Sequence, residues 1–309
     1  MPAARAVVFA YHDVGVRCLE ALLSADVEIP LVITVADDPR ETRWFASVAE
    51  AATARGLRLL IPQNPNTQEL ERAVAALQPD WLFSFYYRSL LSQDLLRSAR
   101  RGALNMHGSL LPKFRGRAPV NWAILRGEQE TGATLHYMVE RADAGDIVDQ
   151  LAVPILRDDD ARQVLGKVTV AAETILARSL PALLAGTAPR RPQPVEPGEY
   201  FGRRRPEDGR IDWSRPAQEI HNLVRAVAPP FPGAFTTANG ERWWIHTTRM
   251  ELPRGEPAQT RRLLGENGRC YVSCQDGVRL RLLAAATAAG PLDMAAVAHA
   301  AQASLITLE

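Results

Sequence analysis

The residues best suited to chemistry lie in the stretch 104–119, where Asn105 and His107 stand two positions apart. On an extended backbone, side chains two residues apart point to the same side of the chain. The imidazole of His107 can take a proton from an attacking amine. The amide NH₂ of Asn105 can donate a hydrogen bond to an oxyanion that forms on a carbonyl. This spacing is therefore suited to acyl transfer.

A second segment, residues 134–148, supplies a carboxylate that could assist the imidazole. Residues 134–139 are predicted to form a strand, and residues 141–145 form a polar turn with Asp143 at its centre. A buried carboxylate there could bind the N–H of His107, fix its tautomer and raise its basicity. A lone histidine after a strand is more often structural, but three residues with complementary roles favour catalysis.

The stretch that follows His107 has the composition of a rigid, cationic ligand loop. Its turn-forming and basic residues are Gly108, Pro112, Lys113, Arg115, Gly116, Arg117 and Pro119. A second basic run, Arg203 to Arg205, stands later in the chain. Such a run is usually a solvated face, and the alternative is that it binds a phosphate of a substrate.

Strands and helices alternate through the first half of the chain. The expected strands are 6–10, 27–35, 57–61 and 81–85, and the expected helices are 16–25, 44–55, 67–77 and 92–98. Continuous apolar strands in this order indicate an α/β fold with a parallel sheet. Ligands of such sheets bind beyond the carboxyl ends of the strands. Five polar residues directly follow predicted strands, namely His12, Tyr86, Tyr87, His107 and Asp143.

The composition changes at residues 185–198, which are rich in proline, glycine and arginine and form the candidate linker. Short β-type runs follow it at 234–237, 242–248, 269–274 and 278–284, with hairpin signals at Asn239-Gly240 and Asp276-Gly277. This pattern predicts a small antiparallel barrel. The domains are therefore expected over residues 1–190 and 200–309, and residues 295–305 fit either a helix or a strand.

Composition excludes several classes of protein. The net charge of +1 gives no overall attraction to nucleic acid or to an anionic membrane. Three cysteines without a C-x-x-C pair predict neither a zinc cluster nor a disulfide framework, and favour a cytoplasmic protein without a bound metal. No apolar run is expected to cross a membrane. The chain lacks a P-loop and the glycine-rich dinucleotide fingerprint. The oligomeric state stays open, with a homo-oligomer as one possibility.

Several motifs together resemble the folate-dependent formyltransferases. They are the Phe-Ser-Phe-Tyr-Tyr-Arg stretch 83–88, the Asn-Met-His-Gly-Ser-Leu-Leu-Pro stretch 105–112, Arg-Gly-Arg-Ala-Pro at 115–119 and Asp-Ala-Gly at 143–145. The likeness is greatest to the family members that act on UDP-4-amino-4-deoxy-L-arabinose in lipid A modification and polymyxin resistance. Residues 9–13, 200–204 and 212–213 also look like those enzymes. The resemblance implies a Rossmann-like formyltransferase domain followed by an OB-like antiparallel β-barrel domain.

The resemblance also implies roles for individual residues. Asn105 would stabilise the oxyanion, His107 would be the general base and acid, and Asp143 would tune His107. The residues expected to hold 10-formyltetrahydrofolate are Ser89, Leu90, Leu91, Arg117, Val139, Glu140, Arg141, Ala142 and Asp143. Those expected to hold the nucleotide sugar are Tyr11, Arg115, Arg203 and Arg204.

The expected reaction is transfer of the formyl group from 10-formyltetrahydrofolate to the 4-amine of UDP-4-amino-4-deoxy-L-arabinose. Other nucleotide-linked amino sugars and methionyl-tRNA are alternative acceptors, and a non-catalytic folate- or nucleotide-binding module is an alternative of another class. The tRNA enzymes typically have a small residue in place of Arg117. The acidic stretch 37–41 would also repel a phosphate backbone, so we expect no nucleic-acid partner.

Overall fold

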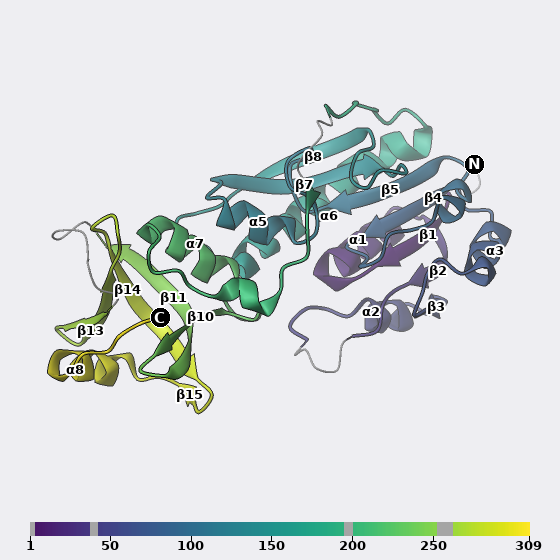
Figure 1. Ribbon diagram of the computed structural model, residues 1–309. Coiled ribbons are helices and arrows are strands. Elements are labelled where there is room, and N and C mark those ends of the chain that lie inside the picture. Colours follow the sequence, from purple (N-terminus) through teal and green to yellow (C-terminus); the bar gives the residue numbers. More distant parts are fainter. Residues whose placement is uncertain (1–3, 38–42, 195–199, 252–261) are drawn as a thin grey trace. The chain divides into compact units, whose positions relative to one another are not determined.

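A computed structural model describes residues 4–37, 43–194, 200–251 and 262–309 of the chain (Figure 1). Most of the acidic stretch 37–41 lies outside these residues. The chain divides into two compact units. The first comprises residues 1–119, 130–154 and 165–202, and the second comprises residues 120–129, 155–164 and 203–309. Two segments that precede residue 165, namely 120–129 and 155–164, thus belong to the second unit.

The first unit is built on a seven-stranded sheet in the order β3-β2-β1-β4-β5-β7-β8 (Figure 1). Its strands are β1 Arg5–Ala10, β2 Glu28–Ile33, β3 Leu59–Leu60, β4 Trp81–Phe85, β5 Gly102–His107, β7 Glu130–Tyr137 and β8 Ile147–Pro154. The α/β class expected from the alternation of strands and helices is confirmed, as is the Rossmann-like domain that the resemblance implies. Strands β1 to β5 are parallel, as buried apolar strands favour.

The sheet is mixed, however, because β7 runs antiparallel to β5 and β8 runs antiparallel to β7. The parallel sheet expected from the sequence is found in β1 to β5, and two antiparallel strands extend it beyond β5. The chain leaves β5 at His107 and re-enters the sheet beside the same residue, where Thr134 of β7 is its partner. When a chain leaves one end of a strand and returns to the sheet at that same end, the two strands run antiparallel.

Five helices and one strand pair complete the first unit. The helices are α1 His12–Ser24, α2 Val48–Ala54, α3 Gln68–Ala76, α4 Gln93–Arg97 and most of α6 Ala161–Ala185; the pair is β6 Arg115–Gly116 with β9 Tyr200–Phe201. Ser47, Thr67 and Ser92 cap the starts of α2, α3 and α4 through their hydroxyls. The helix expected at residues 16–25 begins earlier than predicted, because α1 starts at His12, with one residue between it and the end of β1.

One apolar cluster lies between the sheet and helices α3 and α4. Its residues are Val7, Phe9, Leu31, Ile33, Leu70, Val74, Leu82, Leu91, Leu95, Ala99 and Ala103. Leu82 and Ala103 are register partners on neighbouring strands, and Phe9, Ser84 and Asn105 are the partners two residues further along. Because side chains two residues apart share a face, Asn105 continues the cluster's face toward the carboxyl end of the strands.

Helix α6 is long and apolar enough to cross a membrane by length and composition, which differs from the sequence expectation. Half of its most apolar window is buried within the protein. Arg178 on this helix forms an ion pair with Asp149 of β8, and Glu173 pairs with Arg17 of α1. These contacts are those of a core helix that covers a sheet.

The second unit contains an antiparallel sheet in the order β10-β11-β14-β13-β12, with β15 beside β14. Its elements are α5 Pro119–Leu125, η1 Pro206–Gly209, α7 Ala217–Ala226, β10 Ala234–Ala238, β11 Glu241–Glu251, β12 Leu263–Glu266, β13 Arg269–Ser273, β14 Arg279–Thr287, β15 Gly290–Pro291 and α8 Met294–Ala303. The C-terminal tail bridges both edge strands, since Leu308 pairs with Ala238 and Thr307 with Arg262. The open question at 295–305 is answered by α8, a helix.

Candidate active site

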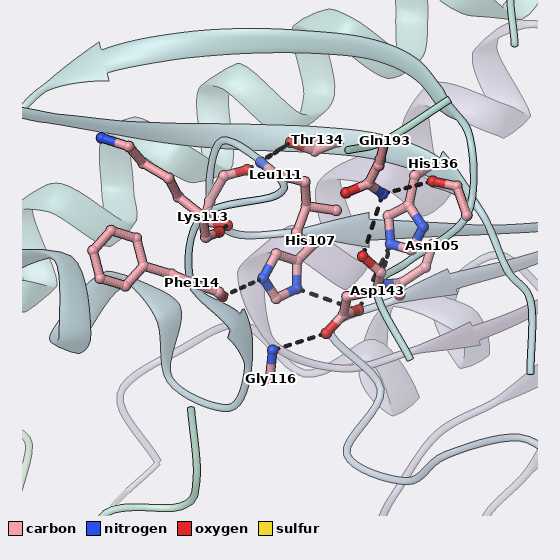
Figure 2. Close-up of polar contacts among 12 residues, drawn as sticks. Asn105, His107, Leu111, Lys113, Phe114, Gly116, Thr134, His136, Asp143 and Gln193 are labelled. Carbon is pink, nitrogen blue, oxygen red and sulfur yellow. Dashed lines mark hydrogen bonds and ion pairs between the residues drawn. The ribbon is translucent and has the colours of Figure 1, made fainter. Parts of the chain in front are cut away.

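The register of β5 and β7 brings two histidines to one asparagine. Asn105 lies opposite His136, and His107 lies opposite Thr134. Residues directly opposite in an antiparallel pair share a face of the sheet, so Asn105, His107 and His136 project to one side (Figure 2). The two-residue spacing of Asn105 and His107 thus has the consequence expected from the sequence, and His136 joins them from the neighbouring strand.

His136 is a neutral acceptor that orients the amide of Asn105. Its Nδ1 lies 2.8 Å from the carbonyl oxygen of Tyr137, which can only accept, so Nδ1 carries the proton. Its Nε2 is then the acceptor for the Asn105 Nδ2, 3.2 Å away. Burial lowers the pKa of His136 to about 4, and the nearby Asp143 carboxylate opposes this only in part. The same assignment places the NH₂ of Asn105, rather than its carbonyl, toward His136.

His107 is held by a backbone carbonyl. Its Nε2 donates to the carbonyl oxygen of Phe114 at 2.9 Å, which leaves Nδ1 as the nitrogen that can exchange a proton. Asp143 faces this nitrogen, with 3.6 Å between Oδ1 and Nδ1 (Figure 2). The tautomer in this structure is thus set by Phe114, whereas the sequence analysis assigned that task to Asp143.

Asp143 reaches the histidines by a route that differs from the sequence expectation. Because β7 is antiparallel, its last residue, Tyr137, lies beside Leu104, three residues before His107 in β5. The loop 138–146 therefore folds back over the sheet to place Asp143 near both His107 and His136, the latter at 3.7 Å. Its Oδ2 accepts a hydrogen bond from the backbone N–H of Gly116 at 2.9 Å.

A polar network shapes the loop that carries Phe114. The hydroxyl of Thr134 donates to the carbonyl of Ser109 and accepts from the backbone N–H of Leu111. The amide of Gln150 donates to Thr134 and to the carbonyl of Leu111. The hydroxyl of Ser109 donates to the carbonyl of Lys113 at 2.6 Å. This network fixes the loop and, through Phe114, the ring of His107.

Gly108 has no room for a side chain. A Cβ at this position would lie 1.9 Å from the hydroxyl oxygen of Tyr86. That hydroxyl is buried, and burial raises the pKa of Tyr86. The glycine that follows His107 is therefore required by the close approach of the loop after β4.

The two loops expected to hold the folate are anchored in the same apolar cluster. Leu91 belongs to the cluster and Met138 packs against it. Their neighbours Leu90 and Val139 are 67% and 46% exposed. Exposed apolar side chains on two anchored loops fit a flat aromatic ring such as a pterin. The amide of Asn66 donates to the carbonyl of Leu90 and fixes the first loop.

The other predicted site residues are placed as follows. In the two loops expected to hold the folate, Ser89 and Ala142 are half-buried, while Glu140 and Arg141 are exposed. Arg117 is also exposed, and its backbone N–H donates to the carbonyl of Phe201.

The residues expected to hold the sugar nucleotide divide between the units. Tyr11 donates to Asp37 at 2.9 Å, and the guanidinium of Arg88 lies 4.5 Å from the centre of its ring. Arg115 is only 4% exposed. Arg203 and Arg204 belong to the second unit, where Arg204 donates to the carbonyl of Asp208.

No group of three potential metal ligands occurs among the residues that the structure describes. All three cysteines of the chain are buried and unpaired.

Two family models match the chain. One is described as formyl transferase and matches residues 5–180, and the other is described as formyl transferase, C-terminal domain, and matches residues 204–296. The chain belongs to the formyltransferase family. The first match contains Asn105, His107, His136 and Asp143.

Solved structures with the same fold include several formyltransferases. An N-formyltransferase from Helicobacter canadensis, in complex with folinic acid and dTDP-3-aminofucose, is 21% identical with a TM-score of 0.69 over 91% of this chain and 98% of that one. WlaRD, a sugar 3N-formyltransferase solved with dTDP and 5-N-formyl-THF, is 19% identical with a TM-score of 0.68 over 95% and 99%. A 4-N formyltransferase from Francisella tularensis is 20% identical with a TM-score of 0.60 over 75% and 91%.

Sequence reasoning missed three contributors to this formyltransferase site. His136 could have been found from the sequence, because it is a histidine within the strand expected at residues 134–139. The carbonyl of Phe114 has none, since every residue has a carbonyl. The amide of Gln193, which donates to the carbonyls of Asp143 and Gly145, lies far away in the sequence.

Proposed function

We propose that this formyltransferase transfers the formyl group of 10-formyltetrahydrofolate to the 4-amine of UDP-4-amino-4-deoxy-L-arabinose. One observation carries the chemistry: an oriented amide donor and an imidazole share one face of β5, with a carboxylate beside the imidazole. 10-Formyltetrahydrofolate supplies an activated N-formyl group, and the sugar supplies the amine. The three unpaired cysteines favour the reducing cytoplasm as the place of reaction.

Asn105 has the geometry of an oxyanion donor. One hydrogen of its amide is directed to His136, and the other has no acceptor among the described residues. That second N–H can donate to the oxygen that becomes negative when the amine attacks the formyl carbon. The donor is oriented before the reaction, so no reorganisation is needed as charge develops, and such a contact contributes on the order of 10²–10³-fold.

His107 moves the proton at Nδ1, because Nε2 is held by Phe114. It takes a proton from the attacking amine and returns it to the departing nitrogen. Asp143 stabilises the imidazolium that exists between these two transfers. General acid–base catalysis of this kind contributes on the order of 10²–10⁴-fold.

The folate is assigned to the loops 89–91 and 139–143, with Arg117 beside it. Their shared anchor in one apolar cluster and the exposure of Leu90 and Val139 support this assignment. The sugar nucleotide is assigned to Tyr11 and Arg115 in the first unit. Guanidinium groups suit a diphosphate because they can donate two parallel hydrogen bonds to it.

The choice of acceptor rests on the resemblance of residues 9–13, 83–88 and 200–204 to the enzymes of lipid A modification and polymyxin resistance. A second candidate acceptor is a dTDP-linked amino sugar. It is favoured by the solved structures of this fold that contain dTDP-3-aminofucose or dTDP.

The decisive experiment follows the release of tetrahydrofolate from 10-formyltetrahydrofolate in the presence of UDP-4-amino-4-deoxy-L-arabinose. We expect saturable release with one formylated sugar per folate. Parallel reactions contain dTDP-3-aminofucose or methionyl-tRNA. Turnover with the dTDP sugar alone would move the assignment to the second acceptor. Folate binding without turnover on any acceptor would contradict the catalytic proposal.

A further inference from the structure

The chain that follows α6 contacts the loops of both His107 and Asp143. Two of its described pieces, residues 191–194 and 200–201, are called the strap here; both belong to the first unit. We propose that the strap sets the placement of Asp143 against His107, with Gln193 as a positioning residue. This inference rests on the proposed function, because it concerns how the same two side chains are held.

Gln193 holds the backbone of the Asp143 loop. Its Nε2 donates to the carbonyl of Gly145 at 2.6 Å and to the carbonyl of Asp143 at 3.2 Å (Figure 2). Asp143 has a φ of +54°. A residue other than glycine in this left-handed region is strained and persists only where its surroundings hold it. The two hydrogen bonds from Gln193 lie directly on the strained segment.

Arg191, two residues before Gln193, attaches the strap to Ile147 through backbone hydrogen bonds. The N–H and carbonyl of Arg191 pair with the carbonyl and N–H of Ile147, at 3.0 and 2.8 Å. The side chain of Arg191 is exposed. Gln193 is therefore anchored next to β8, at the point where the Asp143 loop enters that strand.

The second piece of the strap acts on the carboxylate of Asp143 through Gly116. Phe201 pairs with Gly116, and its carbonyl accepts from the N–H of Arg117 at 2.8 Å. Gly116 has a φ of +105°, and a Cβ there would lie 2.3 Å from the carbonyl oxygen of Phe201. Only glycine allows this approach. The pairing presents the N–H of Gly116 to Oδ2 of Asp143.

The same piece supports His107 from the other side. The ring of Phe201 packs on the ring of Phe114, with 5.1 Å between their centres. The carbonyl of Phe114 is the acceptor for Nε2 of His107. The strap thus contacts the partners of both catalytic side chains, and moving it would change the 3.6 Å separation of Nδ1 and Oδ1.

The test compares Gln193→Leu with the matched control Arg191→Ala in the full chain. Leucine has a similar size but cannot donate to the two carbonyls, whereas the control removes only an exposed side chain. We expect kcat to fall about 10- to 100-fold in Gln193→Leu, since a displacement of about 1 Å can cost about 10²-fold. The KM for the folate should rise by less than kcat falls, although the same loop is assigned to the folate. The KM for the acceptor and the Tm should stay close to those of the wild type, and the control should keep its kcat.

Phe201→Leu provides a second, independent variant, because it keeps the backbone pairing with Gly116 and removes the ring contact with Phe114. We expect a fall in kcat without a matching rise in KM here too. Wild-type kcat in both variants would overturn the inference, as would a loss that Arg191→Ala shares or that only follows a lowered Tm. Absence of turnover in the wild type on every acceptor would instead overturn the proposed function.

Discussion

Replacing His136 with phenylalanine should remove a large part of the protein's sensitivity to acid. His136 is 1% exposed, and burial lowers its pKa to about 4, from the ordinary value of 6.5. At neutral pH the ring is uncharged in the folded protein and accepts from Asn105. In the unfolded chain the same ring takes up a proton below about pH 6.5.

The direction of the effect follows from proton linkage. Between pH 6.5 and about 4, the unfolded chain binds a proton at His136 that the folded protein does not. The free energy of unfolding is therefore intact above pH 6.5 and falls as the pH drops through this window. The difference between pKa values of 6.5 and about 4 corresponds to about 3 kcal/mol. His12, whose pKa burial also lowers to about 4, adds a loss of the same direction.

The assay is urea unfolding of the wild type and His136→Phe at about pH 7.5 and about pH 4.5. Each protein is compared with itself, so any packing change caused by phenylalanine cancels. We expect the wild type to lose more stability than the variant over this interval, by up to about 3 kcal/mol. Equal losses in the two proteins would refute the assignment of His136 as a buried neutral ring.

His136→Gln is the matched control for catalysis. Glutamine does not titrate, so this variant should lose the same acid sensitivity as His136→Phe. Its carbonyl oxygen can still accept from the amide of Asn105, which phenylalanine cannot do. We therefore expect the glutamine variant to keep a higher kcat than the phenylalanine variant, and the reverse order would count against orientation of Asn105 by His136.

Two further predictions concern the proton-transfer pair. His107→Ala should lower kcat by about 10²–10⁴-fold while the KM for the folate stays near that of the wild type, because the ring moves protons without binding the donor. Steady-state kinetics with both substrates would measure this. Retained turnover would exclude His107 as the base. Asp143→Asn should keep an acceptor for the N–H of Gly116 but lose the negative charge beside Nδ1. Its kcat should fall while its Tm stays within a few degrees, and an unchanged kcat would remove the carboxylate from the mechanism.

The pair Asn105 and His107 is predictable from the sequence, because its geometry depends only on neighbouring residues. The spacing of Asn105 and His107 implies a shared face because strand geometry has a period of two. The helices expected from residues 67 and 92 begin where predicted, since the hydroxyls of Thr67 and Ser92 cap α3 and α4. Features of this kind depend only on neighbouring residues.

Strand direction was not predictable in the same way. Apolar periodicity marks residues 134–139 as a strand but does not say whether that strand runs parallel or antiparallel to its neighbour. The antiparallel pairing of β7 with β5 is what brings His136 to Asn105 and sends Asp143 back over the sheet. If β7 ran parallel to β5, a different loop would be needed to bring Asp143 to His107.

Backbone carbonyls decide the chemistry of both histidines. The carbonyl of Tyr137 makes Nε2 of His136 an acceptor, and the carbonyl of Phe114 makes Nδ1 of His107 the nitrogen that exchanges protons. Because every residue has such a carbonyl, no residue pattern reveals which one will face a ring. In the proposed mechanism, the side chains that place the Phe114 carbonyl, such as Thr134 and Phe201, contribute to catalysis without touching a substrate. Substitutions at these positions should change kcat by moving the ring of His107, although Asn105, His107 and Asp143 themselves are unchanged.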